Sequence, residues 1–394
     1  MNDPDIAEAR TLIRSDIAAK VNFASAQNAV PIIRTLEVAN RGETPIEGAT
    51  LSLDATPSFC RTKSWTLDRI EAGGTTNVSD RDLSLDLGRL DGLNEAERGE
   101  IALILRDRDG AELARHVAPV ELLARDQWGG LGEMAQILAA FVAPNDPAVP
   151  RLLKEASRLL EASGRSGAID GYQSKDPARA WMLAGTIWSA ATGLGLSYAE
   201  PPASFELQGQ KVRDPGRILG EGLATCLDTS LLMAAALEAA GLAPVVAFKR
   251  GHAFAGVWLR ETGLRSVVER DVTEVRKAVA GNELVVFETT LLTSRPVVGF
   301  EHAVDAGRRH LSEAEEAEFD RAVDVRRARR RKPPPREPPR GARRRGGAPR
   351  RRARATAVPT RLRPPARRDR RGGAEHARRP HRAMAAQAAG PLAP

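Results

Sequence analysis

The chain of 394 residues is poor in cysteine and in aromatic residues. It has two cysteines, Cys60 and Cys226, and aromatic side chains make up 4% of the chain. Two cysteines so far apart, without the spacing of a disulfide framework, argue against a disulfide-built secreted domain. The acidic N-terminus MNDPDIAEAR also lacks the apolar segment of a signal peptide. We therefore expect a cytoplasmic protein.

The sequence also lacks an uninterrupted hydrophobic run of membrane-spanning length. Residues 231–248 are mostly apolar, but Glu238, Gly241 and Pro244 interrupt them. This pattern predicts a helix followed by a strand, not a membrane span, so no membrane association is expected.

Excess positive charge is confined to the end of the chain. The whole chain carries a net charge of +8, and residues 326–394 hold 23 Arg and 1 Lys against 3 acidic residues, which leaves −13 for residues 1–325. Phosphate contacts need clustered Lys and Arg. We expect no broad nucleic-acid binding by residues 1–325, whereas residues 326–394 are expected to bind polyanions nonspecifically.

Residues 326–394 contain no Phe, Ile, Trp or Tyr, so they are predicted to form a disordered basic tail. A second hypothesis explains the same composition. Arg, Pro, Gly and Ala can all be encoded by codons made only of G and C, so a GC-rich gene read in a shifted frame gives this mixture. The preceding stretch SEAEEAEFDRAVDVRRARR predicts a helix, and a frameshift would begin near Lys332.

The remaining sequence predicts an α+β multidomain fold. A short N-terminal helix is expected within residues 1–20, followed by an Ig-like β-sandwich over residues 21–125. The sandwich is predicted from short alternating runs separated by turn signals. These runs are PIIRTLEVAN, ATLSLDA, TLDRI, DLSLDLGRL, EIALILRD and ELARHVAPVELLA.

From residue 128 the apolar spacing becomes helical, which predicts a helical connector and an α+β domain over residues 128–325. Trp181 and Trp188 lie seven residues apart on one predicted helix and are expected to pack in the core. The proline-containing segment YAEPPASFELQGQKVRDPGRI reads as a long loop, a kind of segment that often has a functional role.

Cys226 lies at the start of a predicted buried helix that ends near Gly241. The free N–H groups and the positive end of the helix dipole favour a thiolate at this position. The same N–H groups can bind an oxyanion. We therefore predict that Cys226 is a nucleophile.

His252 begins the strand HAFAGVWL, which is predicted to pair with PVVAF. An imidazole at this strand end can accept the proton of Cys226. Its other nitrogen needs an acceptor, and Glu288 at the end of NELVVFE is the candidate, with Asp271 as the fallback.

These residues resemble the transglutaminase-like superfamily of papain-type folds. The resemblance covers about residues 175–295 and rests on C-L-D followed by A-G-L-x-P, on G-H-A-F, and on F-E-T-T. It implies that Cys226 is the nucleophile, His252 the general base and acid, and Glu288 the orienting carboxylate. The chain departs from the family in having Glu where Asp is usual, and in a helical insertion after the His strand that could shape a lid or groove.

The run from Tyr198 to Leu242 also resembles the transglutaminase-like portion of large bacterial proteins of unknown function, in which helicase and nuclease domains follow. No G-x-x-x-x-G-K-[ST] motif occurs here, so no helicase chemistry is assigned. The resemblance implies that such domains belong to a larger protein.

Three further sets of residues could contribute to the site. Gln210 is a candidate second oxyanion donor, because papain-like folds use an upstream Gln, and an ordinary loop glutamine is the alternative. Asp228 is expected to be a first-turn acid stabilised by the helix dipole. A zinc site from Cys226, His252 and His302 lacks supporting ligand spacing, so no metal and no cofactor are predicted.

Two functions remain open from the sequence. The first is peptide hydrolysis or acyl transfer on a peptide or protein substrate through a Cys226 thioester. The second is an inactive module that binds a peptide or positions a nucleic-acid enzyme.

Overall fold

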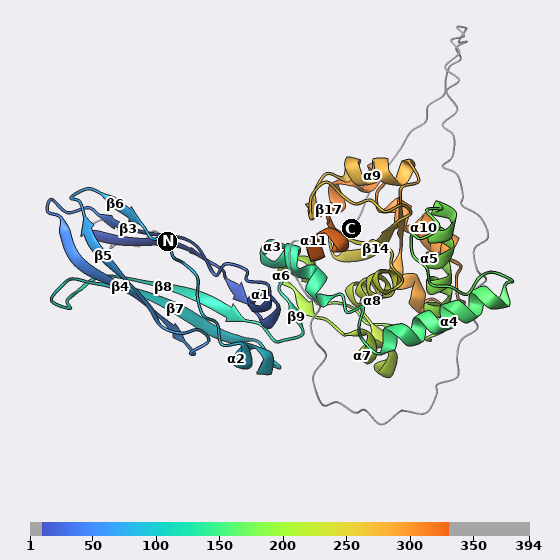
Figure 1. Cartoon of the computed structure of the whole chain (residues 1–394), viewed down its shortest axis with the longest axis horizontal. Helices are drawn as coiled ribbons and strands as arrows, with labels where there is room; N and C mark the ends of the chain where they lie inside the picture. The colour runs from blue at the N-terminus through green and yellow to red at the C-terminus, as the bar shows by residue number, and fades with distance from the viewer. Residues whose placement is uncertain (1–9, 331–394) are drawn as a thin grey trace, which may run out of the picture. The chain divides into compact units, whose positions relative to one another are not determined.

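A computed structural model describes residues 10–330 (Figure 1). The fold is mixed α/β with several sheets. Within residues 10–330, none of the helices combines the length and the apolar character needed to cross a membrane. The predictions for residues 331–394, including the disordered tail and the frameshift near Lys332, lie outside the described residues.

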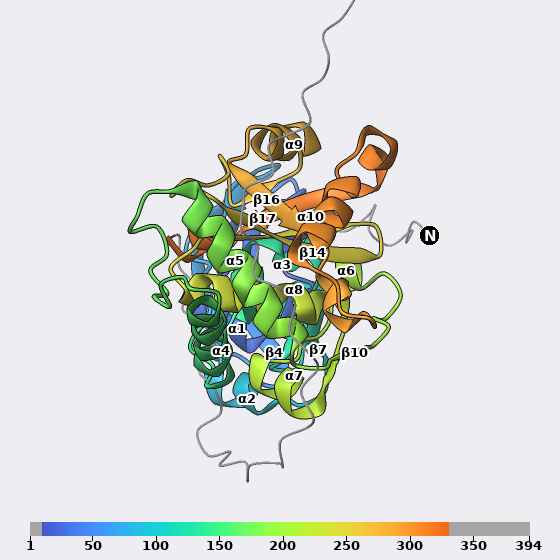
Figure 2. The ribbon, with the colours of Figure 1, turned by 90° about the vertical axis from the view of Figure 1, so that its right-hand side faces the viewer.

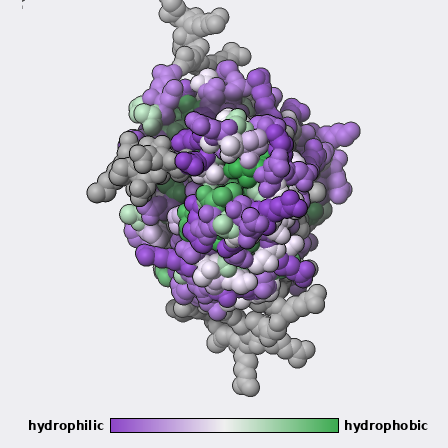
Figure 3. All heavy atoms as spheres, turned by 90° about the vertical axis from the view of Figure 1, so that its left-hand side faces the viewer, coloured by the Kyte–Doolittle hydropathy of each residue, from purple (hydrophilic) through white to green (hydrophobic). Residues whose placement is uncertain are grey.

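The first region consists of two β-sheets that share one hydrophobic core. Leu36 and Val38 on the smaller sheet and Leu51 and Leu103 on the larger sheet belong to the same buried cluster. Figure 3 shows the end of this region that lies at the left of Figure 1, where hydrophilic residues surround a smaller hydrophobic area. The sheets have the orders β1-β3-β6 and β2-β8-β7-β4-β5. Their strands are β1 (Thr11–Ile17), β2 (Lys20–Val21), β3 (Ile33–Asn40), β4 (Ile46–Thr56), β5 (Lys63–Ile70), β6 (Thr75–Asn77), β7 (Glu97–Arg106) and β8 (Glu112–Leu122), with helices α1 (Phe23–Gln27) and α2 (Leu87–Gly92).

Two sequence predictions in this region are wrong. Residues 11–17 form strand β1 and not a helix, because Thr11 and Ile13 point into the core and the strand pairs with β3. The stretch DLSLDLGRL does not form the predicted strand. Leu85 makes an isolated bridge with Cys60, and α2 follows because the Asp86 side chain caps it by accepting from the N–H of Arg89.

The second region is built around an antiparallel sheet with the order β15-β17-β13-β14-β16 and a buried helix, α8. Helix α8 (Cys226–Ala239) is apolar on nearly all sides and buried from Cys226 to Leu237, as expected for a central helix. The sheet strands are β13 (Pro244–Lys249), β14 (His252–Trp258), β15 (Val268–Glu269), β16 (Leu284–Phe287) and β17 (Phe319–Asp324).

Successive side chains of β13 and β14 fill two different cores. Val246 and Ala255 belong to the core that contains α8, whereas Val245 and Phe254 belong to the core that contains α9 (Val272–Ala280). Figures 1 and 2 show α8 and α9 on opposite sides of this sheet. The inserted segment therefore covers the face of the sheet remote from α8 and does not form a lid over Cys226.

Further helices and short strands surround this centre. Trp181 and Trp188 are buried in α5, as the sequence predicted. The remaining elements are β9 (Gln127–Trp128), α3 (Leu131–Met134), the 3-10 helix η2 (Ala135–Phe141), α4 (Ala148–Ala162), α5 (Pro177–Thr192), β10 (Ser197–Tyr198), α6 (Phe205–Gln208), β11 (Gln210–Lys211), α7 (Pro215–Glu221), β12 (Leu223–Ala224), the 3-10 helix η3 (Thr289–Thr293), α10 (Phe300–Arg309), the 3-10 helix η4 (Glu313–Glu318) and α11 (Val325–Arg330).

The predicted helix SEAEEAEFDRAVDVRRARR is also wrong in part. Its middle forms strand β17, which pairs with β13 and buries Ala322 and Val323. The predicted tail boundary at residue 326 is too early, because α11 extends to Arg330 and Ala328 is buried. Arg329 of this helix forms a 2.9 Å ion pair with Glu238 of α8.

Gly307 determines how closely helix α10 approaches strand β16. A Cβ at this position would lie 2.6 Å from Cα of Phe287. We predict that Gly307→Ala lowers the free energy of unfolding by about 2 kcal/mol or more, because the neighbour is backbone and cannot yield. Denaturant titration measures the change.

Gly132→Ala is the matched control. Gly132 lies in α3, and an added Cβ there would meet nothing within 4 Å. Its stability should be unchanged or slightly increased. Equal stability of both variants would contradict the close packing of α10 on β16.

Candidate functional site

Cys226 is the first residue of α8, as the sequence predicted. The helix start is fixed by reciprocal hydrogen bonds between Thr225 and Asp228. The N–H of Asp228 donates to Thr225 Oγ1 (3.2 Å), and the N–H of Thr225 donates to Asp228 Oδ2 (3.0 Å). Asp228 is the predicted first-turn acid, and it also forms a 2.9 Å ion pair with Arg213. These bonds hold Cys226 at a defined position at the helix N-terminus.

His252 is positioned by the tight hairpin between β13 and β14. Lys249 and His252 are paired residues, and the turn between them contains Gly251 at φ +66°. A positive φ is readily adopted by glycine. The turn therefore places the imidazole at the end of the sheet.

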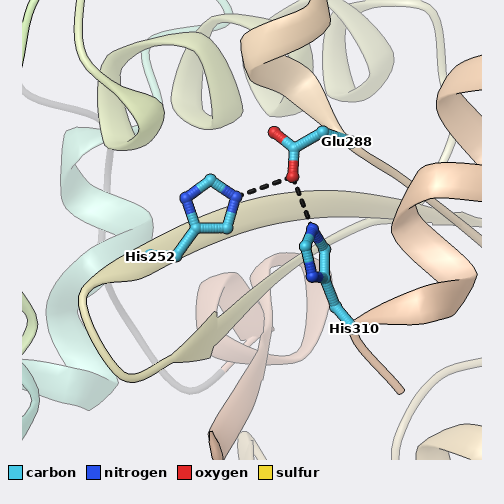
Figure 4. Close-up of side chains that lie close together, drawn as sticks. All are labelled: His252, Glu288 and His310. Carbon is cyan, nitrogen blue, oxygen red and sulfur yellow. Dashed lines mark hydrogen bonds and ion pairs between the residues drawn. The ribbon is translucent and has the colours of Figure 1, made fainter. Parts of the chain in front are cut away.

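Glu288 directly follows β16, which runs antiparallel to β14 with Ala255 opposite Phe287. The end of β16 and the start of β14 thus lie at the same end of the sheet. His252 Nε2 lies 2.6 Å from Glu288 Oε2 (Figure 4). The backbone N–H (2.8 Å) and hydroxyl (2.7 Å) of Thr290 donate to the other oxygen, Oε1. The carboxylate is therefore held with Oε2 directed at the imidazole.

The electrostatics of this pair favour a protonated ring and an ionised carboxylate. Burial disfavours charge on His252, but hydrogen bonds to Cys226 and Glu288 outweigh burial and raise the pKa of His252 to about 9. Burial likewise opposes ionisation of Glu288, but hydrogen bonds from His252 and His310 lower its pKa far below the ordinary value.

The three predicted residues Cys226, His252 and Glu288 are therefore brought together. Because Nε2 of His252 is bound to Glu288, Nδ1 is the ring nitrogen available to the thiol. The thiol is fully enclosed, however, with 0% of Cys226 exposed. The sulfur also interacts with the hydroxyl of Tyr198, a residue on β10 that is itself 39% exposed.

Tyr198 thus contacts both the enclosed sulfur and solvent. Burial and the neighbouring Cys226 and Glu200 raise the pKa of its hydroxyl, which stays protonated and hydrogen-bonded to Cys226. Among residues 10–330, strand β10 consists of two residues and pairs only with Leu223 and Ala224 of β12. The cover over the sulfur is therefore a short segment with few backbone hydrogen bonds.

Gln210 lies at the N-terminus of α8. The role predicted for it, a second oxyanion donor, requires this position. It is buried on β11, and its Nε2 donates to Thr225 Oγ1 at 2.9 Å. An amide nitrogen has two N–H groups, so one remains for another acceptor. Within the described residues, Gln210 Oε1 has no hydrogen-bond partner although it is buried.

Two alternatives from the sequence are not supported. Asp271, the fallback acid, is exposed and caps α9 by accepting from the N–H of Thr273. His302, considered as a zinc ligand, is exposed on α10 and is not part of the cluster of potential metal ligands that contains His252.

Sequence reasoning missed His310, which follows the last residue of α10. Its Nε2 lies 2.7 Å from Glu288 Oε2, so Glu288 accepts from two imidazoles (Figure 4). Its Nδ1 lies 3.3 Å from Glu315 Oε2. In the sequence, His310 is recognisable only as a histidine that follows the basic end of an amphipathic helix. That pattern does not show that the end of α10 packs beside Glu288 at the end of β16.

Comparison with known proteins identifies no family. No family model matches the chain, and no curated protein matches it. Structural matches include an exo-chitosanase of Amycolatopsis orientalis, with TM-score 0.20 and 16% identity over 32% of this chain and 12% of that chain. A putative protease of Parabacteroides distasonis matches with TM-score 0.21 and 12% identity over 56% of this chain and 40% of that chain. The chain thus spans less than half the length of each of these matched structures.

The role of Tyr198 as a cover predicts a specific pair of effects on the alkylation of Cys226. Tyr198→Ala removes the ring, so iodoacetamide should label Cys226 about tenfold faster or more, because less free energy is needed to expose the sulfur. Tyr198→Phe keeps the ring and should change the rate much less. Peptide mass spectrometry measures both rates, and an unchanged rate in Tyr198→Ala would show that the sulfur is reached by another route.

Proposed function

We propose that the chain is a cysteine hydrolase or acyltransferase of the transglutaminase-like, papain-type class, acting on peptide amide bonds through a thioester at Cys226. The observation that carries this proposal is the chain of contacts from the sulfur through His252 to Glu288. A helix-start cysteine, a neighbouring imidazole and a carboxylate that orients the ring are the groups that thiol catalysis requires.

The first half of the reaction forms the thioester. The Cys226 sulfur, whose proton His252 holds, attacks the amide carbonyl carbon. The carbonyl oxygen becomes an oxyanion, which then collapses and breaks the carbon–nitrogen bond. His252 returns its proton to the leaving amine, and the acyl group remains on sulfur.

The second half releases the acyl group. Water or a second amine attacks the thioester carbonyl while His252 removes a proton from the attacking group. The carbon–sulfur bond breaks, and His252 keeps the proton as the sulfur leaves, which restores the starting state. Water gives hydrolysis, and an amine gives acyl transfer. Glu288 stabilises the imidazolium in both halves by accepting from Nε2.

The oxyanion would lie beside the start of α8. The N–H of Cys226 at the helix N-terminus and the second N–H of Gln210 are the donors that we assign to it. Gln210 is held in place by its bond to Thr225, the residue before the nucleophile. Substrate entry requires displacement of Tyr198, because the sulfur is enclosed.

The enclosed sulfur favours a second candidate function. A binding or scaffold module that keeps the same fold would have no need to expose Cys226. In that case the β10 segment would stay closed when a peptide binds, and the His252–Glu288 pair would stabilise the folded state. The two functions differ in whether the sulfur reacts.

The wider setting is also a proposal, in which the helicase association rests on the sequence resemblance and the rest on residue patterns. We assign the first region to an Ig-like β-sandwich, and we propose a cytoplasmic protein that forms part of a larger helicase-associated assembly. No cofactor is needed for the chemistry above.

Selective alkylation of Cys226 tests thiol catalysis, with Cys60 as an internal reference. Burial and the negative charge of Asp54 raise the pKa of Cys60 to about 11. At pH 7.5 this thiol is almost entirely protonated, so its reaction should be slow and should increase with pH up to about 11. Cys226 should react much faster than Cys60 at pH 7.5.

His252→Ala should slow the alkylation of Cys226 by about 100-fold, because the sulfur loses the imidazole that holds its proton. His302→Ala, on the exposed face of α10, should leave the rate unchanged. If Cys226 reacts no faster than Cys60, or if His252→Ala has no effect, the scaffold function is favoured over the enzyme.

A further inference from the structure

Three metal-binding side chains converge at the end of the sheet. His252, Glu288 and His310 each offer one ligand atom, and these atoms all lie within 4.8 Å of one another (Figure 4). They come from the start of β14, the end of β16 and the end of α10. Two imidazoles and one carboxylate form a ligand set used for zinc and other first-row transition metals.

The surrounding hydrogen bonds orient the three ligand atoms toward one point. Thr290 occupies Oε1 of Glu288, which leaves Oε2 facing both Nε2 atoms. The far nitrogen of His310 lies 3.3 Å from Glu315 Oε2. Metal-bound histidines commonly donate their other N–H to a carboxylate, which fixes the tautomer and the orientation of the ring.

The charge of Lys249 is balanced at this site. Its Nζ lies 3.4 Å from His310 Nδ1 and 2.5 Å from Glu315 Oε2. Because Lys249 is ion-paired with Glu315, it does not present an uncompensated positive charge to an incoming cation.

Space for an ion and its water is available beside these residues. A hollow of about 490 Å³ is lined by all three residues and also by Lys249, Arg309 and Glu315. Cys226 is not among its lining residues. Three protein ligands with an adjoining hollow leave a fourth position for water, as in open zinc sites.

The adjustment needed to bind an ion is small. Tetrahedral ligands about 2.1 Å from zinc are about 3.4 Å apart, whereas the two Nε2 atoms now lie 2.6 Å and 2.7 Å from Oε2. Each imidazole must move by less than about 1 Å, and the metal replaces the protons now shared with Oε2.

We propose that His252, Glu288 and His310 form a binding site for a divalent transition-metal ion of the zinc class, and that the bound ion blocks thiol chemistry at Cys226. The second part rests on the proposed function. An ion on Nε2 displaces the proton at that atom, so the neutral ring carries its remaining proton on Nδ1. The metal-bound ring can therefore no longer form the imidazolium that is paired with the Cys226 sulfur.

Zinc binding is tested first in the full chain carrying Cys226→Ala, so that no thiol at residue 226 contributes. Isothermal titration with ZnCl2 should show a saturable site with one ion per chain. Adding His310→Gln should weaken this site more than tenfold, whereas adding His302→Gln, on the same helix, should leave it unchanged. Absence of a site that depends on His310 overturns the proposal.

Inhibition is tested in chains that retain Cys226. Zinc should slow alkylation of Cys226, EDTA should restore it, and His310→Gln should raise the inhibitory zinc concentration more than tenfold, each protein being compared with its own metal-free rate. Equal inhibition of both proteins would place the ion on Cys226 and overturn the blocking role. If Cys226 does not react even without metal, the proposed function fails, while the titration of Cys226→Ala still decides the metal site.

Discussion

The carboxylate of Glu288 joins two histidines from separate parts of the chain, and the geometry of the site depends on it. One oxygen accepts from Thr290, and the other accepts from both His252 and His310. Without this acceptor the His252 ring would lose its fixed orientation toward Cys226. The same oxygen also brings α10 to the end of the sheet, where Gly307 permits close contact with β16. The packing of α10 and the orientation of the imidazole are therefore linked.

The second constraint is access to the sulfur. Cys226 is at a helix start that supports an anion, yet the side chain is fully enclosed and the Tyr198 hydroxyl contacts it. A nucleophile under a cover can react only when the cover moves, and β10 is the short segment that would move. The metal site lies beside a different opening, which means that an ion could reach His252 while Tyr198 stays in place.

Local sequence patterns were sufficient for the parts of the site that depend on local structure. The apolar run after Cys226 predicted α8, and the alternating strand after Gly251 predicted the position of His252. Glu288 was predicted correctly because β16 runs antiparallel to β14, which brings the end of β16 next to the start of β14. His310 and Tyr198 were not found, because their positions depend on tertiary packing of a helix end and a loop. Strand β17 was predicted as a helix because its residues favour a helix locally, whereas pairing with β13 holds them extended. Strand β1 was also predicted as a helix, and pairing with β3 holds it extended.

The protonation state of the His252 ring tests the central claim most directly. Long-range ¹H–¹⁵N NMR of the full chain at pH 7.5 in EDTA, with the signal assigned by its loss in His252→Gln, reports whether one or both ring nitrogens carry a proton. We predict a doubly protonated ring, because the pKa of His252 is raised to about 9, and a neutral ring in Glu288→Gln. A neutral His252 in the unmodified chain would contradict it.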